Sequence, residues 1–315
     1  MMAALALAVS LCSCGKTGVE TVRGRCELSV SAVADGIPTK GYSETGEFYE
    51  TSPSQLHGIW KDPVPRTMQL SAYLHPQNGE PGAYFTDKTF SLSDEGGIWW
   101  NTNTVGGAHD PIYWPVMSTL DFLAYSVSLE DSRGVVPSWD ESNPAEKVVL
   151  TVPAENSQND ILFAGVSGLK SGDAAASVNM RFSHAQAWLQ FVVTSDSPAP
   201  VRLKRIVLRN VYNAGVLTVI NNSGRAVASW DFSSVIRNDV TVDNTASVEE
   251  LGAEPQYLDM LIPQQQKTSV TVCYTVGDDP SERSRTFESD QKTWLMGEKY
   301  IYTINISALE VGVTP

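Results

Sequence analysis

The sequence has few basic residues, few cysteines and few histidines, and each shortage excludes a class of protein. Lys and Arg number 22 against 36 Asp and Glu, so the formal net charge is −14. Such a surface suits neither nucleic-acid phosphates nor anionic lipid. Four cysteines in 315 residues do not make a disulfide scaffold. The four histidines have no metal-ligand spacing, and we expect no metal and no other cofactor: His57, His75, His109 and His184.

The usual catalytic motifs are also missing. The chain has no Gly-x-Ser-x-Gly elbow and no His-Glu-x-x-His. Gly15-Lys16-Thr17 is similar to the end of a phosphate loop, but position 10 is Ser10 where that loop needs glycine. We therefore expect no enzyme. Because carboxylates are plentiful, a secreted hydrolase with an acid pair stays as an alternative that no residue singles out.

No stretch reaches the ~18 apolar residues of a transmembrane helix. The apolar run over 4–11 has the length of a signal-peptide core, although the usual basic residue before it is missing. Leu11-Cys12-Ser13-Cys14-Gly15 resembles the bacterial lipobox, which places diacylglycerol on Cys14. Two acyl chains anchor a protein stably where one does not. We predict a signal peptide over 1–13, a lipidated tether over 14–25, and a lipid-anchored protein at the outer membrane.

What the sequence does have is alternation of apolar and polar residues with period two, which is typical of strands half-buried in a sheet. The apolar positions fall in six clear runs, at 28–32, 68–72, 148–152, 189–193, 270–276 and 300–306. Turn residues separate these runs, and a helix is considered only for 229–238. A small, polar stretch over 168–176 divides the chain. We predict an all-β protein of antiparallel sandwiches, with domains over 26–170 and 171–315.

Tryptophan is the one aromatic residue type that suggests a binding surface. Trp99, Trp100 and Trp114 fall in one region with Tyr113. Exposed aromatic rings stack on sugars, so these residues are a candidate glycan platform. The competing interpretation is that they pack in the core.

Four segments together carry a family resemblance. The first is the lipobox at Cys14, and the second is Tyr113-Trp114-Pro115 followed by Phe122-Leu123-Ala124-Tyr125. The third is Asp160-Ile161-Leu162-Phe163-Ala164 followed by Phe182-Ser183-His184-Ala185, and the last is the closing run from Trp294 through Gly297 to Tyr302. In this order they resemble the fimbrillin-like family of Bacteroides-type anaerobes, whose members are subunits of lipoprotein-derived pili.

The resemblance implies two tandem transthyretin-like sandwich domains and a structural, adhesive role. It implies other fimbrial subunits as partners, in a pilus on the cell surface, and possible binding to a host or bacterial surface. The alternative is a glycan-binding surface lipoprotein built from the same sandwiches, with the three tryptophans as its platform.

The resemblance also implies assembly after a trypsin-like protease removes the first strand, so that a neighbour's strand fills the groove. Here the first strand would be 28–33, and the turn-rich stretch after it contains Lys40, the candidate cleavage site. The candidate donor segment contains Leu309, Val311 and Val313, where the apolar phase shifts after 306.

Cys26 and Cys273 are expected not to be bonded to each other. Alternation places them on different faces of what we predict to be different domains, whereas a disulfide needs Cα atoms about 5.5 Å apart.

Overall fold

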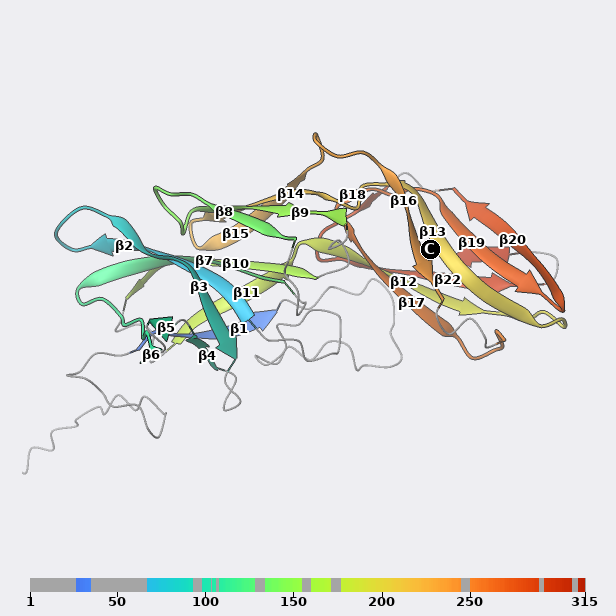
Figure 1. Cartoon of the computed structure of the whole chain (residues 1–315), viewed down its shortest axis with the longest axis horizontal. Helices are drawn as coiled ribbons and strands as arrows, with labels where there is room; N and C mark the ends of the chain where they lie inside the picture. Colours follow the sequence, from blue (N-terminus) through green and yellow to red (C-terminus); the bar gives the residue numbers. More distant parts are fainter. Residues whose placement is uncertain are drawn as a thin grey trace, which may run out of the picture.

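The computed structural model describes residues 27–34, 67–92, 98–102, 104–105, 108–127, 134–154, 160–170, 177–244, 250–288, 292–307 and 311–314. Every regular element named in these ranges is a β-strand, which confirms the all-β prediction. The described residues form no helix able to cross a membrane. The strands gather in two lobes along the long axis of the molecule (Figure 1).

The N-terminal lobe is built on a closed barrel of seven strands. Its order is β1 (Ser29–Ala34), β11 (Ser177–His184), β10 (Ile161–Lys170), β7 (Ser118–Val127), β2 (Thr67–Pro76), β3 (Gly82–Leu92) and β4 (Ile98–Asn101), which returns to β1. β1 runs parallel to β11 and antiparallel to β4. Leu28, Met68, Phe122 and Phe182 are among the buried side chains that fill the barrel. A small hairpin, β5 (Thr104–Val105) and β6 (Ala108–His109), is paired separately.

A second sheet covers the outer face of β7 and β10. Its order is β15 (Arg225–Asp231), β14 (Gly215–Asn222), β9 (Lys147–Val152) and β8 (Val136–Trp139). Tyr125 and Phe163 from the barrel pack with Leu150 and Leu217 from this sheet in one buried cluster. β7 and β10 therefore have apolar side chains on both faces.

The C-terminal lobe is a sandwich of two four-stranded sheets. One has the order β17 (Gln256–Pro263), β12 (Gln186–Thr194), β22 (Lys299–Ile306) and β23 (Val311–Thr314), and the other β16 (Asn238–Asp243), β13 (Val201–Val211), β19 (Val270–Val276) and β20 (Asp279–Phe287). β18 (Gln265–Gln266) pairs with β21 (Thr293–Trp294). A single apolar core, including Phe191 and Ile304, lies between the sheets.

The closing run from Trp294 to Tyr302 contributes two aromatic side chains, Trp294 and Tyr302, to this core. Trp294 is fully buried, and its indole Nε1 donates to the Tyr302 hydroxyl at 2.8 Å. Gly297 has a φ of 70°, a left-handed value that favours glycine, and its N–H donates to the Gln186 carbonyl. The three residues fasten the last strands to the start of β12.

The six predicted alternating runs fall on the strands β1, β2, β9, β12, β19 and β22, with only Leu28 lying one residue before its strand. In β9, for example, Val148, Leu150 and Val152 are buried and the residues between them are not. The helix considered for 229–238 is wrong, because this stretch contains the end of β15, turn residues and the first residue of β16. The transthyretin-like topology stays a prediction.

Strand pairing crosses the boundary predicted between residues 170 and 171. β11 closes the barrel, and β14 pairs with β9, so both belong with N-terminal strands. The chain passes between the lobes at 184–186, at 211–215 and at 231–238. The remaining bounds, at 1–13 and 14–25, lie outside the described residues.

The three crossings are fastened to one another by aromatic side chains. Trp230 Nε1 donates to the Ala185 carbonyl at 2.7 Å, which joins β15 to the first crossing. The Tyr212 and Phe232 rings stack in parallel at 4.4 Å between centroids, and the Arg237 guanidinium lies 4.6 Å from the Tyr212 centroid. These contacts tie the second crossing to the third.

Asn221 seats the β14–β15 hairpin on the barrel. Its amide Nδ2 donates to the Phe122 carbonyl at 3.0 Å, beside a shift in the β7–β10 register, and its Oδ1 accepts from the Gly224 N–H at 3.0 Å. Gly165 leaves the room for this, since a Cβ there would lie 2.9 Å from the Asn221 side chain. The close approach is possible because residue 165 is glycine.

We predict that Asn221→Ala lowers the free energy of unfolding by about 1–3 kcal/mol, because it leaves the Phe122 carbonyl and the Gly224 N–H without their partner. The neighbouring Asn222 is exposed, so Asn222→Ala should change stability by less than about 0.5 kcal/mol. Urea denaturation measures both variants. Equal losses would contradict this role of Asn221.

Candidate functional site

The first strand, β1, is the part of the molecule whose removal would open the closed barrel. β1 contributes only six residues, yet it joins the two ends of the barrel sheet. On one side Ser29 lies opposite Ser177 of β11, and on the other it lies opposite Trp100 of β4. Without β1, the backbone groups of both neighbours would face an open slot.

The side chains of this strand fill the barrel. Leu28 and Val30 are 0% exposed and belong to its apolar core, and Ser29 between them is also 0% exposed. A chain in this slot therefore needs apolar side chains at the positions of Leu28 and Val30 and a small one at the position of Ser29. Burial of two apolar side chains this large is worth a few kcal/mol in all.

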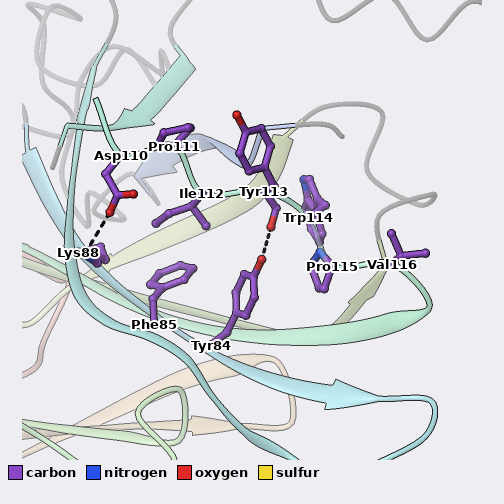
Figure 2. Close-up of a pocket in the computed structure, with 10 residues that line it drawn as sticks. All are labelled: Tyr84, Phe85, Lys88, Asp110, Pro111, Ile112, Tyr113, Trp114, Pro115 and Val116. Carbon is purple, nitrogen blue, oxygen red and sulfur yellow. Dashed lines mark hydrogen bonds and ion pairs between the residues drawn. The ribbon is translucent and has the colours of Figure 1, made fainter. Parts of the chain in front are cut away.

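A loop lies across the N-terminal end of β1. The Leu28 N–H donates to the Ile112 carbonyl at 2.7 Å, and Glu27 forms a β-bridge with Tyr113. We call residues 110–115 the clasp. Figure 2 shows the clasp above β3, with the Tyr84 hydroxyl donating to the Tyr113 carbonyl.

A cavity of about 480 Å³ lies between the clasp and β3. Its lining residues are Tyr84, Phe85, Lys88, Asp110, Pro111, Ile112, Tyr113, Trp114, Pro115 and Val116 (Figure 2). The Lys88 ammonium lies 4.0 Å from the Asp110 carboxylate. No group of three or more His, Cys, Asp or Glu side chains among the described residues could hold a metal ion.

The three tryptophans do not form one platform at this cavity. Trp114 is only 5% exposed, and its ring packs edge-on against Phe122 at 6.0 Å, so it belongs to the core. Its buried Nε1 has no hydrogen-bond partner in the part of the chain that the structure describes. Trp100 is half-buried in β4 and does not line the cavity, and the side chain of Trp99 lies outside the described part. The glycan-binding alternative is left with the cavity beside Tyr113.

The other predicted site residues are scattered. Cys14, Lys40 and Leu309 lie outside the described residues, as does Cys26. Val311 and Val313 are in β23, which pairs antiparallel with β22 at the edge of its sheet. Cys273 is a free thiol buried in β19. Burial, with the nearby Glu282 carboxylate, raises the pKa of this thiol and keeps it protonated.

The structure also contains two polar clusters in buried positions. In the first, His184 is a hydrogen-bonded structural residue, because its Nδ1 lies 2.9 Å from the buried Asp160 carboxylate. The other cluster was not predicted. Lys299 is 3% exposed, with its Nζ 3.7 Å from the Trp188 ring centroid.

The electrostatics of this second cluster follow from burial. Burial lowers the pKa of Lys299 to about 8, although the Asp259 carboxylate opposes the shift. Burial raises the pKa of Asp259, against the hydrogen bonds that its Oδ1 accepts from Trp188 at 2.7 Å and Gln190 at 3.1 Å. The sequence alone could not predict this cluster, because Lys299 and Asp259 lie on two strands, β22 and β17, that are joined only through β12.

These observations define a class: a two-lobed β protein whose barrel is closed by an N-terminal strand with a clasp across its end. The fimbrillin-like family model matches residues 67–314, and the chain belongs to that family.

Solved structures share this fold at low sequence identity. One is a candidate cell adhesion protein from Bacteroides ovatus, with 12% identity and a TM-score of 0.58. Another is a candidate cell adhesion protein from Bacteroides uniformis, with 15% identity and a TM-score of 0.51. Each alignment covers 93% of this chain and 96% of the other. A comparison with curated protein sequences found no match.

Proposed function

We propose that this protein is a structural subunit or accessory protein of a fimbria, without enzymatic activity, that serves adhesion at the cell surface. Family membership supports the fimbrial role, and the Bacteroides neighbours are described as candidate cell adhesion proteins. Its partners are other fimbrial subunits.

The proposed assembly step is strand exchange, and β1 is the observation that carries it. Proteolysis after Lys40 would separate β1 from the rest of the chain. The slot left behind would have two unpaired strand edges and two empty apolar positions, where Leu28 and Val30 had been. Exposed edges pair readily with another strand. A strand from a neighbour would restore both the main-chain hydrogen bonds and the apolar contacts.

The C-terminal strand has a sequence that fits the slot. Val311-Gly312-Val313 repeats the apolar–small–apolar pattern of Leu28-Ser29-Val30. The small middle residue matters because Ser29 is fully buried. β23 has four residues and lies at a sheet edge, so its release would leave β12 and β22 paired. The fit assigns Val311 to the position of Leu28 and fixes the register.

We predict that limited trypsin cleavage after Lys40 yields a species that oligomerises, because the slot becomes available to β23 of another copy. The control combines Lys40→Gln with Lys61→Gln and Arg66→Gln, which removes every tryptic site between β1 and β2, and it should stay monomeric. Deleting residues 309–315 should weaken assembly, and so should Gly312→Leu, which puts a bulky side chain where only a small one fits. Light scattering after size-exclusion chromatography measures each species.

The outcome that would contradict strand exchange is specific. If the cleaved protein stays monomeric at high concentration, even with a peptide spanning 307–315, self-polymerisation is wrong. A capping or anchoring role in the fimbria would then replace it.

The proposal includes export as a lipoprotein anchored through Cys14. We predict that wild-type protein partitions into detergent, and that Cys14→Ala accumulates as a soluble or unprocessed form, because no lipid can be attached. Cys12→Ala is the matched control and should be processed like wild type. Detergent phase partitioning and intact mass measure this. A Cys14→Ala variant that matures and partitions normally would overturn the lipobox interpretation.

A further inference from the structure

The clasp is the feature of this site that the proposed function does not yet explain. It contains Tyr113-Trp114-Pro115, part of the segment that carries the family resemblance. Trp114 neither forms a glycan platform nor finds a hydrogen-bond partner for its Nε1. The contacts of the clasp nevertheless converge on one place, which is the backbone at the start of β1.

Several neighbours hold the clasp in position. At its first residue, the Asp110 carbonyl accepts from the Asn101 side chain of β4, and the Asp110 carboxylate faces Lys88 of β3. In its middle, the Tyr113 carbonyl accepts from the Tyr84 hydroxyl of β3. Near its end, Trp114 is buried against Phe122 of β7. A loop fixed by three barrel strands presents its backbone at a defined place.

The clasp then makes two contacts with the chain that enters β1. The Ile112 carbonyl accepts the Leu28 N–H at 2.7 Å, and Tyr113 bridges to Glu27. These contacts lie beyond the ladder that β11 and β4 form with 29–34. They hold the N-terminal end of β1, which is the end farther along the chain from the cleavage site at Lys40.

We propose that the clasp holds and sets the register of whatever strand occupies the slot of β1, with Tyr84 as its positioning residue. This rests on the proposed strand exchange. In the uncleaved chain the clasp retains β1 through Leu28. After exchange, the same Ile112 carbonyl accepts from the donor residue that takes the position of Leu28. A one-residue slip would turn the apolar side chains out of the barrel, so a fixed end contact selects the correct register.

The first test uses the uncleaved full-length chain and does not depend on assembly. Tyr84→Phe removes the hydroxyl that holds the Tyr113 carbonyl and keeps the ring. A typical net hydrogen bond corresponds to about a five-fold change in a local opening equilibrium. We expect amide hydrogen exchange over 27–30 to rise about five-fold, with exchange in β7 unchanged.

Tyr257→Phe is the matched control, because Tyr257 is exposed in β17 of the other lobe, and it should leave exchange over 27–30 unchanged. Unchanged exchange in Tyr84→Phe would overturn the proposal. An equal rise in β7 would also overturn it, because the hydroxyl would then stabilise the whole lobe.

The second test follows assembly after trypsin cleavage. If β1 must leave before a donor enters, Tyr84→Phe should assemble about five-fold faster than wild type at the start of the reaction. If wild type assembles and Tyr84→Phe assembles at the same rate, the clasp has no role in strand exchange. If neither protein assembles, the strand-exchange proposal is wrong. The amide hydrogen exchange over 27–30 then decides alone whether the clasp retains β1.

Discussion

The N-terminal lobe depends on one constraint: the sheet of the barrel closes only through β1. The N–H and C=O groups of β4 and β11 that face this strand have no other strand to pair with in the closed sheet. Two side chains, Leu28 and Val30, complete the apolar core at the same place. A short strand thus contributes both backbone pairing and packing. In the proposed assembly, a strand from another copy takes the place of β1 and supplies the same backbone pairing and the same packing.

A subunit that exchanges one strand has to keep the rest of its fold. The chain crosses between the lobes three times, and Trp230, Tyr212 and Phe232 fasten the crossings together. The β14–β15 hairpin reaches back to the barrel and is held there by Asn221. β7 and β10 are buried on both faces, and neither strand borders the slot in the order of the sheet. Removing β1 therefore leaves the lobe with most of its core in place.

Period-two alternation predicted much of this fold, because a strand with one buried face carries that pattern in its own sequence. β9, and β22 from Tyr302 to Ile306, are examples in which apolar residues are buried and their neighbours are not. The pairing of β14 with β9 could not be predicted, since two strands whose paired residues are more than 60 positions apart carry no local signal of their partner. The predicted boundary after residue 170 missed β11 and the β14–β15 hairpin for this reason.

The candidate site was predicted only in part. The position of β1 was expected from alternation and from the family resemblance, and the strand is there. Composition could not decide whether Trp114 was a platform or a core residue, since a buried and an exposed tryptophan look alike in a sequence. The hydrogen bonds of the clasp to Leu28 and Tyr84 are accepted by the backbone carbonyls of Ile112 and Tyr113. Because every residue has a carbonyl, no residue type in the sequence predicts these contacts.

Whether β23 of one copy enters the slot of another is measured most directly by cysteine cross-linking between copies. The register that places Val311 at Leu28 puts Thr314 at Ser31, opposite Asn179 of β11, whereas within its own chain Thr314 lies opposite Thr303. Chains carrying Thr314→Cys are mixed with isotopically heavy chains carrying Asn179→Cys, and the disulfides are identified by mass spectrometry. Strand exchange predicts a light–heavy link between positions 314 and 179 that appears only after cleavage at Lys40. Cleaved chains that form no light–heavy link between positions 314 and 179 would contradict it.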